Sequence, residues 1–260
     1  MRNSKTLKKI HQNRCARVCG LGHYLPFFVR YAAHFGYDVI WLDLEHRAMT
    51  DREVQSLLGL CYHNNIDCMV RPPTQERTRL YRYFEDGATG LMMPLISDAE
   101  EAQHIVNAVK FPPMGNRGMD GAGLDGDFGL GVWHPDSTYT DDANRETFIV
   151  IQIETPEALE NVEEIAAVPG VDALFVGPGD LGLRLSQSEN GTQTRLDEAI
   201  AQVADAARRQ GIAWGIPAGT PELIKQYRGM GAQLLAYGGD FSLAAVLERS
   251  SQDFDEALEE

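Results

Sequence analysis

The chain has 260 residues, of which 43% are hydrophobic and 8% aromatic. This composition excludes an intrinsically disordered protein and is sufficient for a large core. The 23 basic and 38 acidic residues give a net charge of −15 and a pI near 4.8, which excludes nucleic acid and anionic membranes as natural partners. An anionic substrate would have to meet locally concentrated positive charge.

The first 17 residues carry six basic side chains, but no apolar segment follows them, so we expect an amphipathic opening helix rather than a secretion signal. No apolar run approaches the roughly 18 residues of a membrane span. The four cysteines do not have the spacing of a zinc site. They are Cys15, Cys19, Cys61 and Cys68. We expect reduced thiols in a cytoplasmic protein.

Eight short apolar runs predict β-strands, and helical patterns separate them. The runs are continuously apolar, which is typical of strands buried on both faces of a parallel sheet. The predicted strands are residues 16–20, 39–43, 67–71, 90–95, 148–153, 173–176, 213–216 and 233–237.

Helix starts between these strands carry recognisable caps. Thr50 and Ser97 each precede a glutamate by three residues, as in a capping box, and Thr155 and Thr220 each precede a proline. Eight strand–helix units in about 250 residues predict an α/β fold, a (β/α)8 TIM barrel, with residues 1–260 as a single domain. A doubly wound sheet is the alternative, but no glycine-rich dinucleotide fingerprint follows the first strand.

One segment interrupts the alternation. Residues 116–146 are rich in Gly and Asp and are too long for an ordinary connection. Loops of this length usually have a function of their own. We expect this one to fold over an end of the barrel.

Two carboxylates follow consecutive predicted strands, Glu154 after the fifth and Asp180 after the sixth. Neighbouring strands lie about 4.8 Å apart, so both side chains can reach one cation. Two carboxylates completed by water and ligand are a common way to hold Mg²⁺ or Mn²⁺. A helix cap for Asp180 and a salt bridge for Glu154 are the alternatives.

Asp43 and His46 flank a turn after the second strand, and Arg71 ends the third. A carboxylate beside an imidazole fixes its tautomer and makes it a general base. An arginine in the barrel mouth suits an oxyanion or a carboxylate. The alternatives are a structural histidine, and an internal salt bridge of Arg71 with Glu154 or Asp43.

The segment Gly177-Pro178-Gly179-Asp180 exposes successive backbone N–H groups before a helix, a pattern that binds carboxylate or phosphate. No lysine stands at a strand end, which argues strongly against Schiff-base chemistry in the barrel mouth. The five lysines are Lys5, Lys8, Lys9, Lys110 and Lys225.

Five segments together resemble the HpcH/HpaI aldolase family, metal-dependent (class II) pyruvate aldolases related to citrate lyase β chains. The resemblance runs in order from about residue 16 to residue 250 and lies in residues 41–46 (WLDLEH), 70–72 (VRP), 111–118 (FPPMGNRG), 152–155 (QIET) and 176–181 (VGPGDL).

The resemblance implies an aldolase that cleaves a 4-hydroxy-2-oxo acid to pyruvate and an aldehyde through a metal-bound enolate. It implies that Glu154 and Asp180 bind a divalent metal (Mg²⁺, Mn²⁺ or Co²⁺). Gln152 and the 177–180 segment would bind pyruvate, and Arg71 would stabilise the enolate oxygen. His46, oriented by Asp43, would relay protons. A homo-oligomer, with a hexamer that exchanges C-terminal helices as one form, is implied as well.

The sequence departs from the family pattern at three places. A bulky Trp is usual near Gly20, where His23 or Tyr24 fills the space here; Glu85 replaces a usual Asp; and acidic residues follow Gly118. We expect these departures to lie near the acceptor aldehyde. Two other classes of function stay open: another lyase on the same enolate (an oxaloacetate decarboxylase or an acyl-CoA lyase), and a non-catalytic binding barrel.

Overall fold

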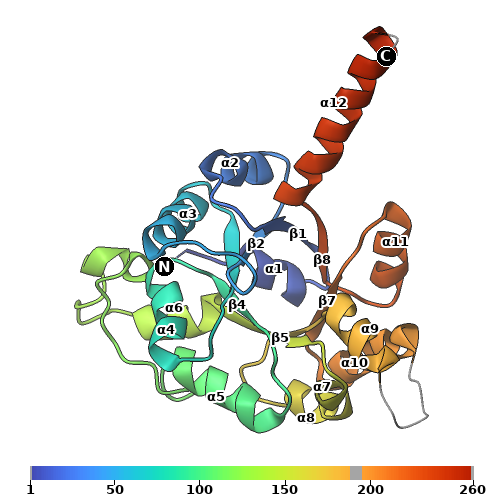
Figure 1. The fold of residues 1–260 in the computed structure, drawn as a ribbon. Helices are drawn as coiled ribbons and strands as arrows, with labels where there is room; N and C mark the ends of the chain where they lie inside the picture. The colour runs from blue at the N-terminus through green and yellow to red at the C-terminus, as the bar shows by residue number, and fades with distance from the viewer. Residues whose placement is uncertain (1, 188–194, 259–260) are drawn as a thin grey trace.

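The computed structural model describes residues 2–187 and 195–258, and eight parallel strands in it close into a barrel (Figure 1). Each strand pairs with its neighbours in chain order, and β8 pairs with β1. The predicted (β/α)8 TIM barrel is confirmed. The strands are β1 Ala16–Leu21, β2 Val39–Asp43, β3 Asp67–Arg71, β4 Gly90–Met93, β5 Phe148–Ile153, β6 Ala173–Val176, β7 Ala213–Pro217 and β8 Leu234–Gly239.

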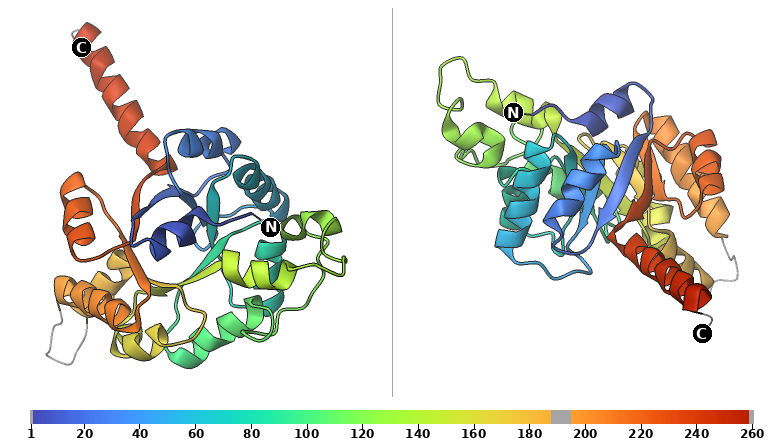
Figure 2. Two further views of the ribbon diagram at one scale, coloured as in Figure 1. Left: turned by 180° about the vertical axis from the view of Figure 1, so that it is seen from behind. Right: turned by 90° about the horizontal axis from the view of Figure 1, so that it is seen from above.

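Helices surround the barrel on all sides except where α12 projects from it (Figures 1 and 2). None of the described helices is long and apolar enough to cross a membrane. The helices are α1 Lys5–His11, α2 Pro26–His34, α3 Asp51–His63, α4 Arg77–Glu85, α5 Ala99–Val109, α6 Tyr139–Glu146, α7 Pro156–Glu160, α8 Val162–Ala166, α9 Pro178–Ser186, α10 Leu196–Gln210, α11 Pro221–Gly229 and α12 Leu243–Leu258, with short 3₁₀ turns at η1 Leu124–Gly129 and η2 Asp240–Ser242.

The predicted helix caps are confirmed with one exception. Thr50 forms the reciprocal capping box with Glu53, and Thr155 and Thr220 cap α7 and α11. The predicted cap at Ser97 is wrong, because Asp98 accepts the backbone N–H of Glu101 and α5 begins one residue later. A charged carboxylate is the stronger acceptor for the exposed N–H groups of a first turn.

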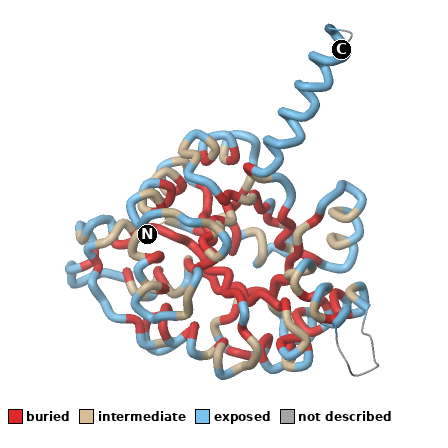
Figure 3. Tube along the Cα trace, viewed as in Figure 1, coloured by how far each residue is buried: buried red, intermediate tan, exposed pale blue. Residues whose placement is uncertain are grey.

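Alternation along each strand divides the core into two parts. Side chains at every second position fill the barrel, and those between them pack under the helices. In β5, Phe148 and Val150 belong to the interior, so Gln152 is the next inward position. In the tube view the buried chain is concentrated in the barrel (Figure 3).

The interior packs around two phenylalanines that need glycines opposite them. A Cβ at Gly90 in β4 would lie 2.2 Å from the ring of Phe148. A Cβ at Gly215 in β7 would lie 2.8 Å from the ring of Phe175. Both rings are fully buried, and with the glycines they fill the barrel, which is therefore a packed core rather than a channel.

The N-terminal face of the barrel is closed by α1, which is shorter than the predicted helix. Asp67, the first residue of β3, is fully buried beneath it. Its carboxylate accepts hydrogen bonds from Arg2 at 2.7 Å, from the Ser4 hydroxyl at 2.8 Å and from the Thr6 N–H at 2.8 Å. This one side chain therefore ties the N-terminal segment to the barrel.

The Gly/Asp-rich segment does not lie over the mouth of its own barrel. It contains η1 and ends in α6, and it packs beside α4 near the N-terminus, whereas α12 leaves from the opposite face (Figure 2). Arg117 forms a buried ion pair with Asp125 inside the segment at 2.7 Å, and it links the segment to α4 through Glu85, 3.9 Å away. Within one chain this segment therefore lies away from the mouth, and the expectation that it and Glu85 border the acceptor stays a prediction.

We expect Asp67→Ala to lower the free energy of unfolding by about 3 kcal/mol, because the Ser4 hydroxyl and the Thr6 N–H would stay buried without an acceptor. Denaturant unfolding measures this difference. Asp205→Ala is the matched control: it breaks an exposed pair with Arg208 on α10 and should cost less than about 0.5 kcal/mol. Equal losses in the two variants would contradict the role given to Asp67.

Candidate active site

The carboxyl ends of β2 and β3 place a buried ion-pair cluster in the barrel mouth. Asp43 and Arg71 are paired in register. The Arg71 guanidinium lies 2.9 Å from Asp43 and 3.2 Å from Glu45, and it rests on the ring of Trp41, 4.9 Å from the centroid. Burial raises the pKa of Asp43, but the hydrogen bond and charge of Arg71 outweigh it and leave that pKa below its usual value.

His46 is exposed at the turn after β2, and its surroundings differ from those predicted. Asp43 accepts the backbone N–H groups of Glu45, at 3.1 Å, and of His46, at 3.4 Å. The imidazole Nε2 instead lies 3.6 Å from the carboxylate of Glu45. Because Asp43 is occupied by Arg71 and by the backbone, it shapes the turn, and Glu45 is the carboxylate beside the ring.

Glu154 follows β5 and is only 2% exposed. One carboxylate oxygen accepts the Leu95 N–H at 2.8 Å, and the other accepts the amide of Gln152. Leu95 adopts a left-handed backbone with φ of 55°, a conformation that is unfavourable for a branched side chain. The backbone after β4 is therefore strained where it donates to this carboxylate.

Electrostatics make ionised Glu154 unfavourable in the free protein. Burial raises its pKa, the charges of Glu45 and Asp180 raise it further, and the Leu95 N–H and Arg71 only partly oppose them. Gln152 adds no positive charge, and its own Oε1 is buried without a hydrogen-bond partner. A bound cation would relieve both the desolvation and the repulsion.

Asp180 lies in the first turn of α9 but does not cap it, because Gly177 occupies the cap position. Its carboxylate is about half exposed, and Arg184 lies 3.9 Å away. A Cβ at Gly177 would lie 2.8 Å from Gln152 Nε2 and 3.0 Å from Glu154 Oε2. Only glycine leaves this space open, at the amino end of a helix whose first N–H groups have no helical acceptor.

The residues fit a divalent cation of the Mg²⁺ class. In the described ranges no group of three or more His, Cys, Asp or Glu side chains is arranged to hold a metal ion. A cation here would therefore be bound by Glu154 and Asp180, with water and substrate oxygens as its other ligands. Such a ligand set is usual for Mg²⁺. The raised pKa of Glu154 and the open space beside Gly177 favour this arrangement.

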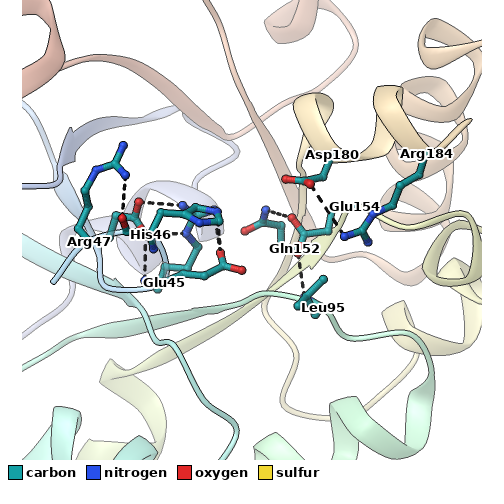
Figure 4. A network of polar contacts seen from close by, with 10 residues as sticks. Glu45, His46, Arg47, Leu95, Gln152, Glu154, Asp180 and Arg184 are labelled. Carbon is teal, nitrogen blue, oxygen red and sulfur yellow. Dashed lines mark hydrogen bonds and ion pairs between the residues drawn. The ribbon is translucent and has the colours of Figure 1, made fainter. Parts of the chain in front are cut away.

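The polar side chains gather into two groups within the mouth. Figure 4 shows Glu45, His46 and Arg47 on one side, and Gln152, Glu154 and Asp180 on the other. The structure therefore brings together the site residues predicted from strand ends. The sequence reasoning did not assign roles to Glu45 and Leu95; for Glu45, its place within the same turn as Asp43 and His46 was an available signal.

The comparisons with known proteins place the chain in a family with the same fold. Residues 24–246 match the family model described as HpcH/HpaI aldolase/citrate lyase. A 2-dehydro-3,6-dideoxy-6-sulfogluconate aldolase of Pseudomonas putida is 35% identical, with 80% of each chain covered. A 4-hydroxy-2-oxo-heptane-1,7-dioate aldolase of Escherichia coli is 30% identical, with 81% of this chain and 79% of that protein covered.

Among solved structures, an HpcH/HpaI aldolase from Desulfitobacterium hafniense superposes with a TM-score of 0.87 at 30% identity, and the match covers 96% of both chains. The fold, the order of the site residues and these relatives point to one assignment. The chain belongs to the HpcH/HpaI aldolase/citrate lyase family and is a carbon–carbon lyase of the aldolase type.

Proposed function

We propose that this aldolase cleaves a 4-hydroxy-2-oxo acid to pyruvate and an aldehyde and also catalyses the reverse addition, with a divalent cation (Mg²⁺, Mn²⁺ or Co²⁺) held by Glu154 and Asp180. The observation that carries the proposal is the unbalanced negative charge at Glu154, whose pKa is raised by burial, Glu45 and Asp180. When bound, such a cation supplies Lewis-acid stabilisation of developing negative charge.

Pyruvate would lie between β5 and α9. Its carboxylate can accept the free N–H groups of Gly179 and Asp180 at the start of α9. Gln152, whose Oε1 has no partner, would fix its orientation through the side-chain amide. Arg71 is buried and permanently charged, and it would donate to the oxygen that becomes negative when the enolate forms.

His46 would handle the proton on the acceptor side. In cleavage the imidazole removes the proton of the C4 hydroxyl, the C3–C4 bond breaks, and the aldehyde leaves. Water then protonates the pyruvate enolate at C3, and the imidazolium returns its proton to the solvent. The Glu45 carboxylate, 3.6 Å from Nε2, stabilises the imidazolium that results. Asp43 supports the same turn by accepting backbone N–H groups.

We also propose that the chain forms a homo-oligomer in which α12 packs on a second copy. None of the described residues of α12 is buried, and its apolar side chains share one face of the helix. They are Leu243, Val246, Leu247, Phe254 and Leu258. In Figure 1 this helix points away from the barrel instead of covering β8.

A groove of about 690 Å³ lies where a helix following β8 would otherwise pack, between α2 and α11. Phe35, Tyr37 and Tyr237 give it an aromatic lining, and four basic residues border it: Lys9, Arg14, Arg17 and Arg228. Helix α12 carries Asp253, Asp255 and Glu256 near its end. Shape and charge therefore favour α12 of another copy as the occupant of this groove.

The proposed reaction predicts metal-dependent release of pyruvate. A panel of 4-hydroxy-2-oxo acids should yield pyruvate with added Mg²⁺, Mn²⁺ or Co²⁺, and a chelator should abolish this activity. Borohydride with pyruvate should leave every lysine unmodified. Pyruvate release that survives chelation, together with a lysine adduct in the mass spectrum, would refute the proposal.

Glu154→Gln provides a readout that does not depend on activity. Because the pKa of Glu154 is raised in the folded state, the wild type loses stability as the pH rises from the ordinary pKa of a glutamate to the raised one. At neutral pH in chelator the variant should therefore melt at a higher temperature than the wild type. This difference should vanish below the ordinary pKa of a glutamate. The wild type, but not Glu154→Gln, should gain stability from Mn²⁺. An equal gain in both proteins would argue against Glu154 as a ligand.

Arg71 and His46 should have separable effects. Arg71→Ala should slow both aldol cleavage and oxaloacetate decarboxylation by about 10²–10³-fold, because both form the enolate. His46→Ala should slow cleavage more than decarboxylation, since the latter needs no hydroxyl proton removed. Rates of both reactions for each variant, with melting curves to check folding, test the assignment. Equal losses in His46→Ala would show that the imidazole is not the acceptor-side base.

Removal of residues 243–260 should lower the number of copies in the assembly, as obtained from its mass in light scattering. The single change Leu247→Glu on the apolar face of α12 should act in the same direction, because a charge would be buried at the contact. Glu248→Gln on the same helix serves as the control for a change of charge alone. An unchanged number of copies per assembly in the truncated protein would exclude this role of α12.

A further inference from the structure

A second polar cluster lies in the barrel mouth, on the β8–β1–β2 side. Asp240 follows β8 and is 4% exposed. Its Oδ2 accepts the Gly22 N–H at 3.0 Å and lies 2.6 Å from Nδ1 of His23, just after β1. This contact fixes a proton on Nδ1 and orients the exposed imidazole so that Nε2 is the nitrogen left for a ligand.

Arg47 completes the cluster from the end of β2. Its guanidinium lies 4.8 Å from the centroid of the Phe241 ring, and the same ring packs against His23 at 5.3 Å. A Cβ at Gly22 would lie 3.2 Å from Cγ and Nε of Arg47. The glycine and the aromatic ring therefore hold this arginine close to the barrel, and its Nη1 donates to the His46 carbonyl at 2.7 Å.

Charge distinguishes Arg47 from the other arginines near the site. Arg71 is paired with two carboxylates, and Arg184 lies beside Asp180. Within residues 2–187 and 195–258, Arg47 has no carboxylate within ion-pair distance, although the whole chain carries a net charge of −15. A guanidinium without a counter-ion, backed by an aromatic ring, is well suited to binding an external carboxylate or sulfonate.

The position of the cluster indicates which part of the substrate it would meet. In a closed eight-stranded barrel β1 and β2 lie opposite β5 and β6. Pyruvate bound at β5 and β6 would present its reacting carbon toward His46, and Arg47 is the residue after His46. The remainder of the acceptor aldehyde, beyond its carbonyl group, would therefore lie against the β8–β1–β2 rim.

We infer that Arg47 and His23 form a subsite for an anionic group at the far end of the acceptor aldehyde, with Asp240 as a positioning residue. This inference rests on the proposed aldolase reaction. Arg47 pairs with the anion, and His23 Nε2 forms a hydrogen bond with the same end of the acceptor. The preferred acceptors are therefore short aldehydes that end in a carboxylate or a sulfonate.

The test compares pyruvate addition to 4-oxobutanoate, to a three-carbon aldehyde sulfonate and to uncharged butanal. The wild type should prefer the charged aldehydes in kcat/KM. Arg47→Ala should reduce the ratio of charged to uncharged kcat/KM by about 10- to 100-fold, the usual loss for a charged hydrogen bond. Arg47→Lys should restore part of it. The carboxylate and sulfonate arms show which anion the subsite favours.

Two further variants distinguish loss of the subsite from a folding defect. Gly22→Ala keeps the guanidinium, but its Cβ would lie 3.2 Å from both Arg47 and the Phe241 ring, so these neighbours must shift by a few tenths of an ångström. It should lower the same ratio by less than Arg47→Ala does. Arg208→Ala, at the end of α10 on the opposite face of the barrel, should leave both classes of aldehyde unchanged. A wild type without preference, or a ratio unaffected by Arg47→Ala, would overturn the subsite. No addition to any aldehyde would instead overturn the aldolase proposal on which the subsite rests.

Discussion

The distribution of charge in the barrel mouth is the constraint on which the site depends. Arg71 is shared by Asp43 and Glu45 on one side. On the other side Glu154 has no ion-pair partner among the described residues, and Asp180 has only Arg184, 3.9 Å away. Burying a carboxylate without a counter-charge is costly. The proposed divalent cation would offset this cost. It would also stabilise the negative charge of the enolate, which no lysine at a strand end can do.

The barrel could be predicted from the sequence because its strands are short, apolar and evenly interrupted by capped helices. The inward positions can also be predicted, because successive side chains of a strand point to opposite faces. Every second residue from Phe148 includes Gln152, and every second residue from Val39 includes Asp43. What the sequence could not provide was the pairing within the mouth. Whether Asp43 or Glu45 lies beside His46 depends on the conformation of one turn, which residue type alone does not determine.

The start of α5 and the placement of residues 116–146 also could not be predicted, because the sequence offers two possibilities for each. Ser97 and Asp98 are adjacent candidates for one helix start, and the carboxylate is the side chain that caps it. The segment 116–146 could cover either end of the barrel; it packs beside α4 instead, where Arg117 lies 3.9 Å from Glu85. The left-handed backbone of Leu95 has no sequence signal, because glycine or asparagine would be the usual choice there.

Exchange of the methyl protons of pyruvate in ²H₂O, followed by NMR without any aldehyde, tests whether a cation held by Glu154 and Asp180 is needed to form the enolate. It reports enolate formation alone and therefore separates the pyruvate site from the acceptor side. We expect exchange that requires a divalent cation and is lost in both Glu154→Gln and Asp180→Asn. Exchange that continues in chelator at the wild-type rate in these two variants would contradict this expectation.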